Sequence, residues 1–541
     1  MYPTIGQVLS EAAGRDPDGV WLRWDISNGS DGSDGPDGPE QGALTFGGAA
    51  DQVAATALRL RESGVGRGDL VVLTARSTPP YLLCWLALAW LGAVSVPCNP
   101  QATPTELAGL LGQVGPRAIV TDEALRARAA PQVPAGTAVL DVEVLTAGWA
   151  LGTAGGAGGA VGAVGAGGAA VRLPPADLDD GDLAVLLPTS GTTGRSKLVM
   201  QTHRAYTMAG EGFPYWMELT TDDRLMTSLP LFHVNALAYS AMGSLTIGAG
   251  LVLLPRFSAS GFLAAARRHG ATEFNAIGAM IEILMLQPER PDDADTPLRL
   301  CYTGPAPTRE RQEQIEARFG LRIVVGYAMS ETTFGLIWPR GTRPYGTLGA
   351  PRQHPRTGVV NRAQVVDESG AQVGAGVTGE LLLSNPAVTP GYWGMPTETA
   401  AVLQDGWLRT GDLVSVGPDG MVTFVGRKKE VLRRRGENLS PLEVEEVLAA
   451  HPAVAECAVV GVPSELSEED VKAFVVRVPG SELDFAGLRA WAAERLSAFK
   501  VPRFWQELGE LPHTPTGRVA KHRLPAGHPD TEHDLERKDG A

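Results

Sequence analysis

The segment with the clearest chemical content is LPTSGTTGRSKLVMQTH, residues 187–203. Glycines let a backbone curl closely around a phosphate, while exposed N–H groups and side-chain hydroxyls donate to its oxygens. The segment has no GxxxxGK[ST] pattern, so it is not a Walker loop. A Ser/Thr/Gly cluster taken alone is more often an ordinary solvated loop. Its six central positions hold four hydroxyl residues and two glycines: Thr189, Ser190, Gly191, Thr192, Thr193 and Gly194.

Later segments carry groups that suit a nucleotide or its metal. Glu331 offers the hard carboxylate oxygens that Mg²⁺ prefers, and Asp412, an acceptor only when ionised, suits a diol. Structural interpretations compete, with Tyr327 as a core aromatic, Asp412 as a turn residue and Glu331 as a carboxylate at a helix start. In chain order the segments are GPA at 304–306, GYAMSET at 326–332, WLRTGD at 407–412, GRKKE at 426–430, GEN at 436–438, FKVP at 499–502 and LPHTPTG at 511–517.

This ordered series resembles the motifs of the adenylate-forming enzymes, which comprise acyl- and aryl-CoA synthetases, nonribosomal adenylation domains and luciferases. TSGTTGRSK looks like their signature loop, and the acyl-CoA synthetase branch fits best. The resemblance implies that Tyr327 stacks on adenine, Ser330 approaches the phosphate and Asp412 binds the ribose. The implied nucleotide-binding residues are Thr189, Ser190, Gly191, Thr192, Thr193, Gly194, Gly304, Pro305, Ala306, Tyr327, Ser330, Thr332, Asp412 and Arg427.

The same resemblance assigns roles to other residues, with Mg²⁺, ATP or an acyl-adenylate, and coenzyme A as the molecules bound. Lys197, Glu331 and Arg518 are the implied catalytic residues, and Glu331 is the implied metal ligand. His233, Asn235, Ala328 and Met329 are expected at the acyl pocket. Lys429 is the implied hinge residue, about which the small domain rotates between two half-reactions. Gly436, Glu437 and Lys500 are expected near CoA, and the Arg433–Arg435 run is a further candidate for its phosphates or else a solvated face.

Two positions depart from the family pattern. The terminal motif of the family ends in a lysine that stabilises charge on the carboxylate and the α-phosphate, and here that position is Arg518. Arginine keeps the charge but is bulkier and planar. Lys521 lies three residues further on, an offset that points to the other face of an extended segment. The signature loop also reads Ser196-Lys197-Leu198 where the family has P-K-G.

Both departures concern adenylation rather than thioester formation. We therefore predict an enzyme that mainly transfers the acyl group of a preformed acyl-adenylate to CoA, with a separate adenylating enzyme as a candidate supplier. The alternative, weighed equally, is a complete two-step synthetase in which Arg518 suffices. In lacking this lysine, the chain resembles acyl-CoA ligases of platensimycin and platencin biosynthesis, which handle bulky diterpenoid acids.

Other functions are weighed on particular residues. Nonribosomal adenylation domains hold the substrate amine with an aspartate after phenylalanine, whereas His233 follows Phe232 here, so we expect an acid without an α-amine. No carrier-protein domain follows, which favours CoA over a tethered thiol. Luciferase-like oxygenation stays open. A non-catalytic nucleotide-binding protein is disfavoured because Glu331, Asp412 and the hinge are present.

Length, charge and cysteine content limit the kinds of fold that can position these residues. The 541 residues exceed what one core usually organises, and the net charge of −15 argues against nucleic acid. The four cysteines lie far apart, which indicates a reducing cytoplasm, and the N-terminus lacks a signal peptide pattern. Residues 79–98 are apolar and almost long enough to span a membrane, but Pro79 and Gly92 predict a buried helix followed by a strand. The oligomeric state is left open.

Short apolar runs alternate with amphipathic stretches, which is the α/β pattern. We expect a large N-terminal α/β domain of several subdomains, residues 1–425, and a small mobile α+β domain, residues 426–541, joined by a hinge. Ser440 and Glu443 predict a capping box at the start of a helix. Residues 27–42 and 152–170 are expected to be loops or disordered. Strands are expected at 70–74, 118–121, 183–187, 250–254, 322–325, 456–460, 472–478 and near 504, and a helix at 485–499.

Overall fold

The computed structural model describes most of the chain. Its described residues divide into two compact units, Met1–Ala363 with Leu383–Leu408, and Gln364–Leu382 with Arg409–Ala541. The described ranges are 2–26, 40–147, 152–153, 173–189, 196–304, 306–356, 361–430, 432–434, 437–463, 469–514, 519–525 and 531–535.

A six-stranded sheet in the first unit has the order β6-β5-β3-β4-β8-β9. Its strands pair in parallel, except that β9 runs antiparallel to β8. The parallel strands are buried, as expected when helices cover both faces. The bounds are β3 (Leu70–Thr74), β4 (Val94–Pro97), β5 (Ala118–Thr121), β6 (Ala138–Asp141), β8 (Leu183–Thr189) and β9 (Lys197–Thr202).

The apolar segment 79–98 is a helix and a strand of this core, as predicted. Helix α3 (Pro79–Leu91) is buried along its whole length, and Gly92 ends it in the left-handed conformation at φ 74°. The chain then enters β4. Within the described ranges, no helix reaches the length and apolar character that a membrane crossing would require.

The second sheet of this unit has ten strands in the order β16-β15-β14-β13-β12-β10-β11-β1-β2-β7. The run from β1 to β14 is parallel, and antiparallel strands complete both edges. The bounds are β1 (Val20–Ile26), β2 (Glu40–Thr45), β7 (Gly152–Thr153), β10 (Arg224–Thr227), β11 (Gly250–Leu253), β12 (Glu273–Asn275), β13 (Leu300–Thr303), β14 (Arg322–Met329), β15 (Thr332–Ile337) and β16 (Ala350–Pro351).

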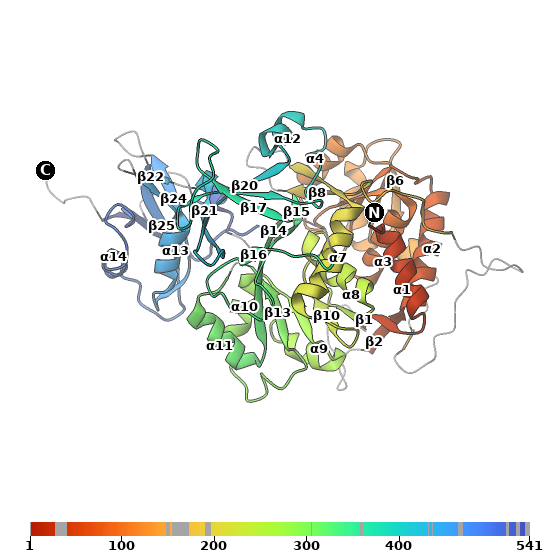
Figure 1. The fold of residues 1–541 in the computed structure, drawn as a ribbon, viewed down its shortest axis with the longest axis horizontal. Coiled ribbons are helices and arrows are strands. Elements are labelled where there is room, and N and C mark those ends of the chain that lie inside the picture. The colour runs from red at the N-terminus through yellow and green to blue at the C-terminus, as the bar shows by residue number, and fades with distance from the viewer. Residues whose placement is uncertain are drawn as a thin grey trace, which may run out of the picture. The chain divides into compact units, whose positions relative to one another are not determined.

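One layer of helices contacts strands of both sheets and holds the main core of the unit (Figure 1). Other helices cover the remaining faces: Phe262 of α9 packs on Phe274 of β12 in a T-shaped contact. The shared layer comprises α1 (Ile5–Arg15), α2 (Phe46–Glu62), α3, α7 (His203–Met217), the π-helix η2 (Ala236–Ala241) and α8 (Met242–Ile247). The unit also contains α4 (Pro104–Val114), α5 (Glu123–Ala129), η1 (Ala130–Gln132), α6 (Val142–Leu145), α9 (Phe262–His269), α10 (Gly278–Met285), α11 (Arg309–Phe319) and α12 (Pro396–Val402).

The second unit is an α+β structure with its own core. Its four-stranded sheet has the order β24-β25-β26-β27. The bounds are β24 (Val454–Pro463), β25 (Glu469–Arg477), β26 (Phe504–Glu507), β27 (Glu532–Asp534), α13 (Pro441–Ala449) and α14 (Phe485–Ala493), with β21 (Val422–Arg427), η3 (Lys428–Glu430), β22 (Leu432–Arg434), β23 (Glu437–Leu439) and η4 (Lys521–Arg523).

In a five-stranded sheet, the strands β17, β18 and β20 each have residues in both units. The sheet has the order β17-β18-β20-β19, and β21 pairs with β20. Residues 364–382 and 409–425, assigned to the first domain by the sequence analysis, belong to the second compact unit. The expected hinge after residue 425 concerns movement and stays a prediction. The bounds are β17 (Arg362–Val366), β18 (Gly379–Ser384), β19 (Leu403–Gln404) and β20 (Trp407–Val416).

Three local predictions were wrong. The expected loops at 27–42 and 152–170 contain strand residues, because Gly42 pairs with Trp24 of β1 and with Thr153; residues 27–39 and 154–170 lie outside the described ranges. The expected helix at 485–499 is shorter, since α14 ends at Ala493.

The third wrong prediction is the capping box at α13. Ser440 is the N-cap residue, but its hydroxyl donates to the carbonyl of Val425 at 2.7 Å and accepts no helix N–H. Glu443 pairs with Lys500 instead of reaching back to the N-cap. Tertiary partners therefore replace the local hydrogen bonds that the sequence pattern favours.

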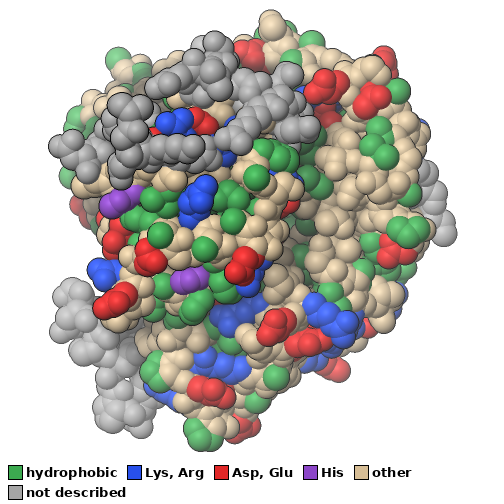
Figure 2. Space-filling view, turned by 90° about the vertical axis from the view of Figure 1, so that its left-hand side faces the viewer, with side chains coloured by type: hydrophobic (Ala, Val, Ile, Leu, Met, Phe, Trp, Pro, Cys, Tyr) green, Lys and Arg blue, Asp and Glu red, His purple; other side chains and the backbone are tan. Residues whose placement is uncertain are grey.

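On the face shown in Figure 2, acidic and basic side chains are interspersed rather than gathered by sign. Such a face produces no extended field of one sign.

Candidate active site

Ser330 and Glu331 form the two-residue tip of the hairpin between β14 and β15. β14 belongs to the parallel part of the ten-stranded sheet, so the hairpin extends from a strand end of that sheet. Ligands of open α/β sheets bind at such carboxyl ends. Glu331 therefore lies in a hairpin turn and not at the start of a helix, which was one interpretation of the sequence. The turn presents Ser330 and Glu331 together.

The carboxylate of Glu331 and the ammonium of Lys197 meet at one tyrosine. The hydroxyl of Tyr392 donates to Oε1 of Glu331 at 2.8 Å. Nζ of Lys197 lies 4.6 Å from the centroid of the Tyr392 ring. Burial raises the pKa of Tyr392, and the neighbouring Glu331 carboxylate raises it further, so the phenol remains a donor. Two sequence-predicted catalytic residues are thus brought together by a residue that the sequence analysis missed.

The segment around Tyr392 also joins β9, which begins with Lys197, to the hairpin tip that carries Glu331. The N–H of Thr389 donates to the carbonyl of Glu331 at 2.7 Å, and the N–H of Met200 donates to the carbonyl of Gly391 at 3.0 Å. Gln201 of β9 donates through its side chain to the carbonyl of Ser330. Backbone hydrogen bonds therefore fix β9 and the hairpin tip relative to each other.

Gly304 follows β13 and approaches β14 closely. A Cβ at this position would lie 2.7 Å from the carbonyl oxygen of Gly326, a distance that real Cβ atoms essentially never show. The expected adenine-binding loop thus begins at a backbone contact that a side chain would break. Ala306 is half-buried, as is Tyr327 on β14. The hydroxyl of Tyr327 lies 3.8 Å from Sδ of Met329.

The residues expected at the acyl pocket lie at the end of β14 and just before the π-helix η2. Nδ2 of Asn275 donates to Oδ1 of Asn235 at 2.7 Å and to Oγ of Ser240 at 3.2 Å. The ring of His233 lies 4.4 Å from that of Phe232, and Ala328 and Met329 are half-buried. Asn275 was missed, although a buried asparagine in a strand of this parallel sheet is a recognisable polar exception.

Arg352, another missed residue, supports the hairpin from within the core. Its guanidinium is 1% exposed and donates to the hydroxyls of Tyr302 and Tyr239. It also reaches the carbonyls of Leu336 at 2.9 Å and Tyr327 at 3.4 Å. No sequence signal distinguishes this arginine, since its role depends on tyrosines far away in the chain.

In the second unit, two expected nucleotide-binding residues face each other. Asp412 of β20 lies opposite Arg427 of β21, and Oδ1 of Asp412 is 3.4 Å from Nε of Arg427. Asp412 is 6% exposed and follows Gly411, whose φ is 71°. The structure therefore pairs an acceptor carboxylate with a guanidinium at one position of the sheet.

Glu380 supports the same strand and was missed. Its carboxylate lies 2.6 Å from Arg409 and 3.2 Å from Lys428, and Oε1 accepts the N–H of Gly411. Burial opposes its ionisation, but the two cations outweigh burial and lower the pKa of Glu380. A lone glutamate at the start of the apolar strand GELLLS was the available signal.

Two of the basic residues expected near CoA, Lys500 and Arg434, have protein partners. Nζ of Lys500 lies 2.6 and 2.7 Å from the two carboxylate oxygens of Glu443. Arg434 is neither a solvated residue nor a surface phosphate ligand: it is 1% exposed and binds Asp470 at 2.9 Å. Arg434 was therefore wrongly placed as a CoA candidate, because it is buried and paired with Asp470 of β25.

Several expected site residues cannot be placed. Those wholly outside the described ranges are Ser190, Gly191, Thr192, Thr193, Gly194, Pro305, Arg435, Gly436 and Arg518, and the side chains of Lys429, Arg433 and Glu437 are likewise not described. Thr189 and Ser196 flank the phosphate loop and are half-buried. Thr332 is buried, with Oγ1 at 3.4 Å from Oδ1 of Asn385.

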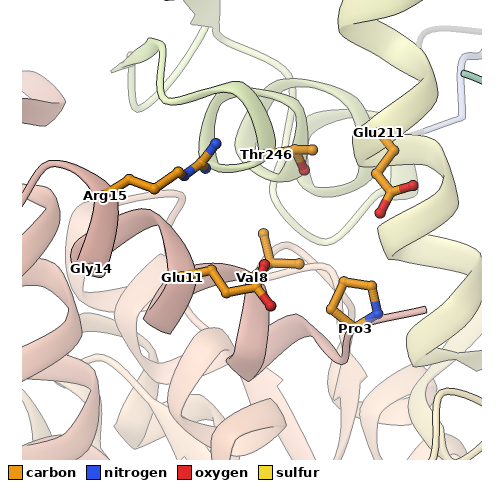
Figure 3. Close-up of a pocket in the computed structure, with 7 residues that line it drawn as sticks. All are labelled: Pro3, Val8, Glu11, Gly14, Arg15, Glu211 and Thr246. Carbon is orange, nitrogen blue, oxygen red and sulfur yellow. The ribbon is translucent and has the colours of Figure 1, made fainter. Parts of the chain in front are cut away.

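A surface pocket of about 320 Å³ lies elsewhere in the first unit (Figure 3). Val8, Glu11 and Arg15 of α1 line it with Glu211 of α7 and Thr246 of α8. It includes none of the expected site residues.

Models of two related domains match this chain. A family described as AMP-binding enzyme matches residues 10–393, and one described as AMP-binding enzyme C-terminal domain matches residues 443–518. A crotonobetaine/carnitine–CoA ligase of Salmonella paratyphi A is 31% identical over 484 residues, which cover 88% of this chain and 91% of the relative.

Solved structures with the same fold cover nearly the whole chain. ATP-bound MatB from Rhodopseudomonas palustris aligns with a TM-score of 0.81 and 26% identity, over 96% of this chain and 98% of that one. A benzoate CoA ligase from Burkholderia xenovorans LB400 aligns with a TM-score of 0.81, covers 96% of this chain and 99% of that one, and at 24% identity shows likeness of fold alone.

Proposed function

Because the chain belongs to the AMP-binding enzyme family, we propose that it joins a carboxylic acid to coenzyme A through an acyl-adenylate. In the first half-reaction a carboxylate oxygen attacks the α-phosphorus of ATP and pyrophosphate leaves. In the second half-reaction the CoA thiolate attacks the acyl carbon and AMP leaves, after the thiol has lost its proton. The thioester step needs mainly orientation, since AMP is a good leaving group and a thiolate a good nucleophile.

The observation that carries this proposal is the convergence of Lys197 and Glu331 on Tyr392. An ammonium beside a carboxylate suits a triphosphate with its magnesium, because Mg²⁺ binds proteins through one or two carboxylates and takes its other ligands from phosphates and water. The described residues contain no group of three or more His, Cys, Asp or Glu that could hold a metal alone. Glu331 is thus a suitable ligand for Mg²⁺, which would neutralise phosphate charge.

Within this activity we propose that adenylation is the weaker half-reaction and that the enzyme mainly uses preformed acyl-adenylate, with a separate adenylating enzyme as its supplier. Arg518 replaces the family lysine. Lys521 is a poor substitute, since its Nζ lies 2.8 Å from Glu445 of α13, a largely buried carboxylate. Losing one well-placed electrostatic contact lowers a rate by about 10²- to 10³-fold.

A complete two-step synthetase is the second candidate. It is favoured by the retained Lys197 and Glu331, which a pure acyl-transfer enzyme would not need. In this case Arg518 would supply the positive charge itself. Loading of a carrier protein instead of CoA is a third, less supported candidate.

For the acid, we propose a compound without an α-amine that carries polar groups. His233 and the Asn235–Asn275 amide pair favour such a substrate, as does the name of the crotonobetaine/carnitine–CoA ligase relative. A bulky diterpenoid acid, like those of platensimycin-type ligases, is the alternative that the position of Arg518 suggests.

The four cysteines are free thiols, which supports a reducing cytoplasmic setting.

Purified protein, CoA and a panel of acids would be supplied either with ATP and Mg²⁺ or as synthetic acyl-adenylates, with acyl-CoA followed by mass spectrometry. We expect product from adenylates, and Arg518→Lys to raise the ATP-dependent rate by about 10²-fold. Arg523→Lys, at an exposed arginine, is the matched control. Equal rates from both sources would refute the weak-adenylation proposal, and no thioester from either would refute the function.

A further inference from the structure

We propose that Tyr392 is a positioning residue that orients the Glu331 carboxylate for Mg²⁺ and holds the Lys197 ammonium beside the same phosphate site. This inference rests on the proposed function, because it assumes that ATP and Mg²⁺ bind there. Tyr392 lies outside every motif singled out in the sequence, in the segment GYWG at 391–394.

The first contact fixes a carboxylate. The side chain of Tyr392 is 5% exposed, and its hydroxyl donates to Oε1 of Glu331 at 2.8 Å. An ionised carboxylate accepts about four hydrogen bonds or metal contacts, so one bond to the phenol still permits metal binding. Hydrogen bonds from a second layer of residues orient metal-binding carboxylates, and removing them typically weakens metal affinity by about 10- to 100-fold.

The second contact holds a cation without using its hydrogen atoms. Nζ of Lys197 lies 4.6 Å from the Tyr392 ring centroid, within the range of a cation–π attraction. Lysine carries three N–H donors, and the ring face attracts the charge rather than accepting them as a carboxylate would. The ammonium therefore keeps donors for phosphate oxygens while its position is restricted.

The backbone makes Tyr392 a rigid support. Tyr392 forms a β-bridge with Val199 of β9, and the N–H of Trp393 donates to the carbonyl of Leu198 at 2.8 Å. The N–H of Tyr392 itself donates to Oγ1 of Thr399 at 2.9 Å. Since Thr389 also binds the Glu331 carbonyl, the segment is attached both to the lysine strand and to the hairpin tip. Displacement of Tyr392 would disturb both charges at once.

Two substitutions separate the two contacts. Tyr392→Phe keeps the ring beside Lys197 and removes the hydroxyl from Glu331, whereas Tyr392→Leu removes both. Tyr206→Phe is the matched control, because the Tyr206 hydroxyl is buried in the same unit and has no hydrogen-bond partner among the residues that the structure describes. Phenylalanine fills the same space in both cases, so the Phe variants should fold as the wild type does.

The experiment measures ATP binding by isothermal titration calorimetry at increasing Mg²⁺. For Tyr392→Phe we expect unchanged ATP affinity without Mg²⁺ and a Mg²⁺ concentration for half-maximal enhancement that is raised about 10- to 100-fold. Tyr392→Leu should in addition weaken ATP binding without Mg²⁺. Thermal unfolding of Tyr392→Phe should stay as cooperative as that of Tyr206→Phe, which a general loss of structure would not allow.

A Tyr392→Phe protein with the Mg²⁺ requirement of the wild type would overturn the inference and leave the proposed function intact. Equal effects of Tyr206→Phe would also overturn it, since the response would then not be specific to Tyr392. A wild-type protein that binds no ATP at any Mg²⁺ concentration would also overturn this inference, whereas the proposed function is refuted only if no thioester forms from either ATP or acyl-adenylates.

Discussion

At the scale of single residues, Gly304 sets how closely the loop after β13 approaches β14. The carbonyl oxygen of Gly326 occupies the space that a Cβ would need. This contact is made by backbone, which cannot rotate away as a long side chain can. The loop position, and with it the expected adenine site, therefore depends on the absence of a side chain.

We expect Gly304→Ala to weaken ATP binding by about tenfold, because overpacking strain of about 1–3 kcal/mol must be relieved by moving the loop or the strand. Calorimetric titration with ATP measures this directly. Gly109→Ala is the matched control, since a Cβ added to Gly109 on α4 would meet nothing within 4 Å. Wild-type affinity in Gly304→Ala would show that the loop does not bind the nucleotide.

At the scale of elements, a buried histidine joins two helices of the layer between the sheets, α1 and α7. His203 opens α7 and is fully buried, and its Nδ1 accepts the N–H of Ile5, the first residue of α1, at 3.3 Å. Burial lowers the pKa of His203 from 6.5 to about 4. The packing of α1 on α7 thus uses the neutral imidazole.

This pKa predicts how stability depends on pH. Between about pH 6.5 and 4 the unfolded chain binds a proton at His203 that the folded chain does not, so the free energy of unfolding falls as pH falls through this window. The contribution reaches about 3 kcal/mol at its lower end. His203→Asn keeps an acceptor for Ile5 and does not titrate, so its stability should depend less on pH.

Urea unfolding at pH 7, 6 and 5 measures this difference. His522→Asn, at an exposed histidine, is the matched control and should keep the wild-type slope. Parallel pH profiles for His203→Asn and the wild type would contradict the assignment.

At the scale of the whole molecule, the two compact units have separate cores. The main core of the first unit runs from Ile5 to Tyr392, and that of the second from Leu432 to Trp505. In the second unit, Lys472 is fully buried and forms an ion pair with Glu532 of β27. This strand lies beyond residue 518, where the match to the C-terminal family model ends.

Separate cores predict that Glu532→Gln lowers the melting temperature of one unit and leaves the other unchanged. Breaking a buried ion pair from one side costs about 3–5 kcal/mol, which in a unit of this size corresponds to a shift on the order of 10 °C. Differential scanning calorimetry resolves the two transitions. Glu507→Gln removes an exposed pair with Arg477 on the same sheet. It should change the free energy of unfolding of neither unit by more than about 1 kcal/mol. A single transition that moves as a whole would refute independent units.

The sequence by itself determined the family, the α/β class and the order of the chemical groups, because each depends on short stretches of chain. Gly92 ended the apolar helix as predicted since a left-handed residue is a local requirement. Strands at 70–74 and 118–121 matched the apolar runs residue for residue. Lys197, Glu331 and Asp412 were predicted as site residues through motifs, which record local spacing.

Only the tertiary structure decided which groups meet, because contacts between distant segments leave no local pattern. Tyr392 is 61 residues from Glu331 along the chain, yet they share a hydrogen bond. Arg352 has its tyrosine partners 50 and 113 residues away. The hydroxyl of Ser440 donates to a carbonyl 15 residues earlier and does not cap its helix. Local sequence therefore indicated the candidate reactive groups, and only packing showed which residues contact them.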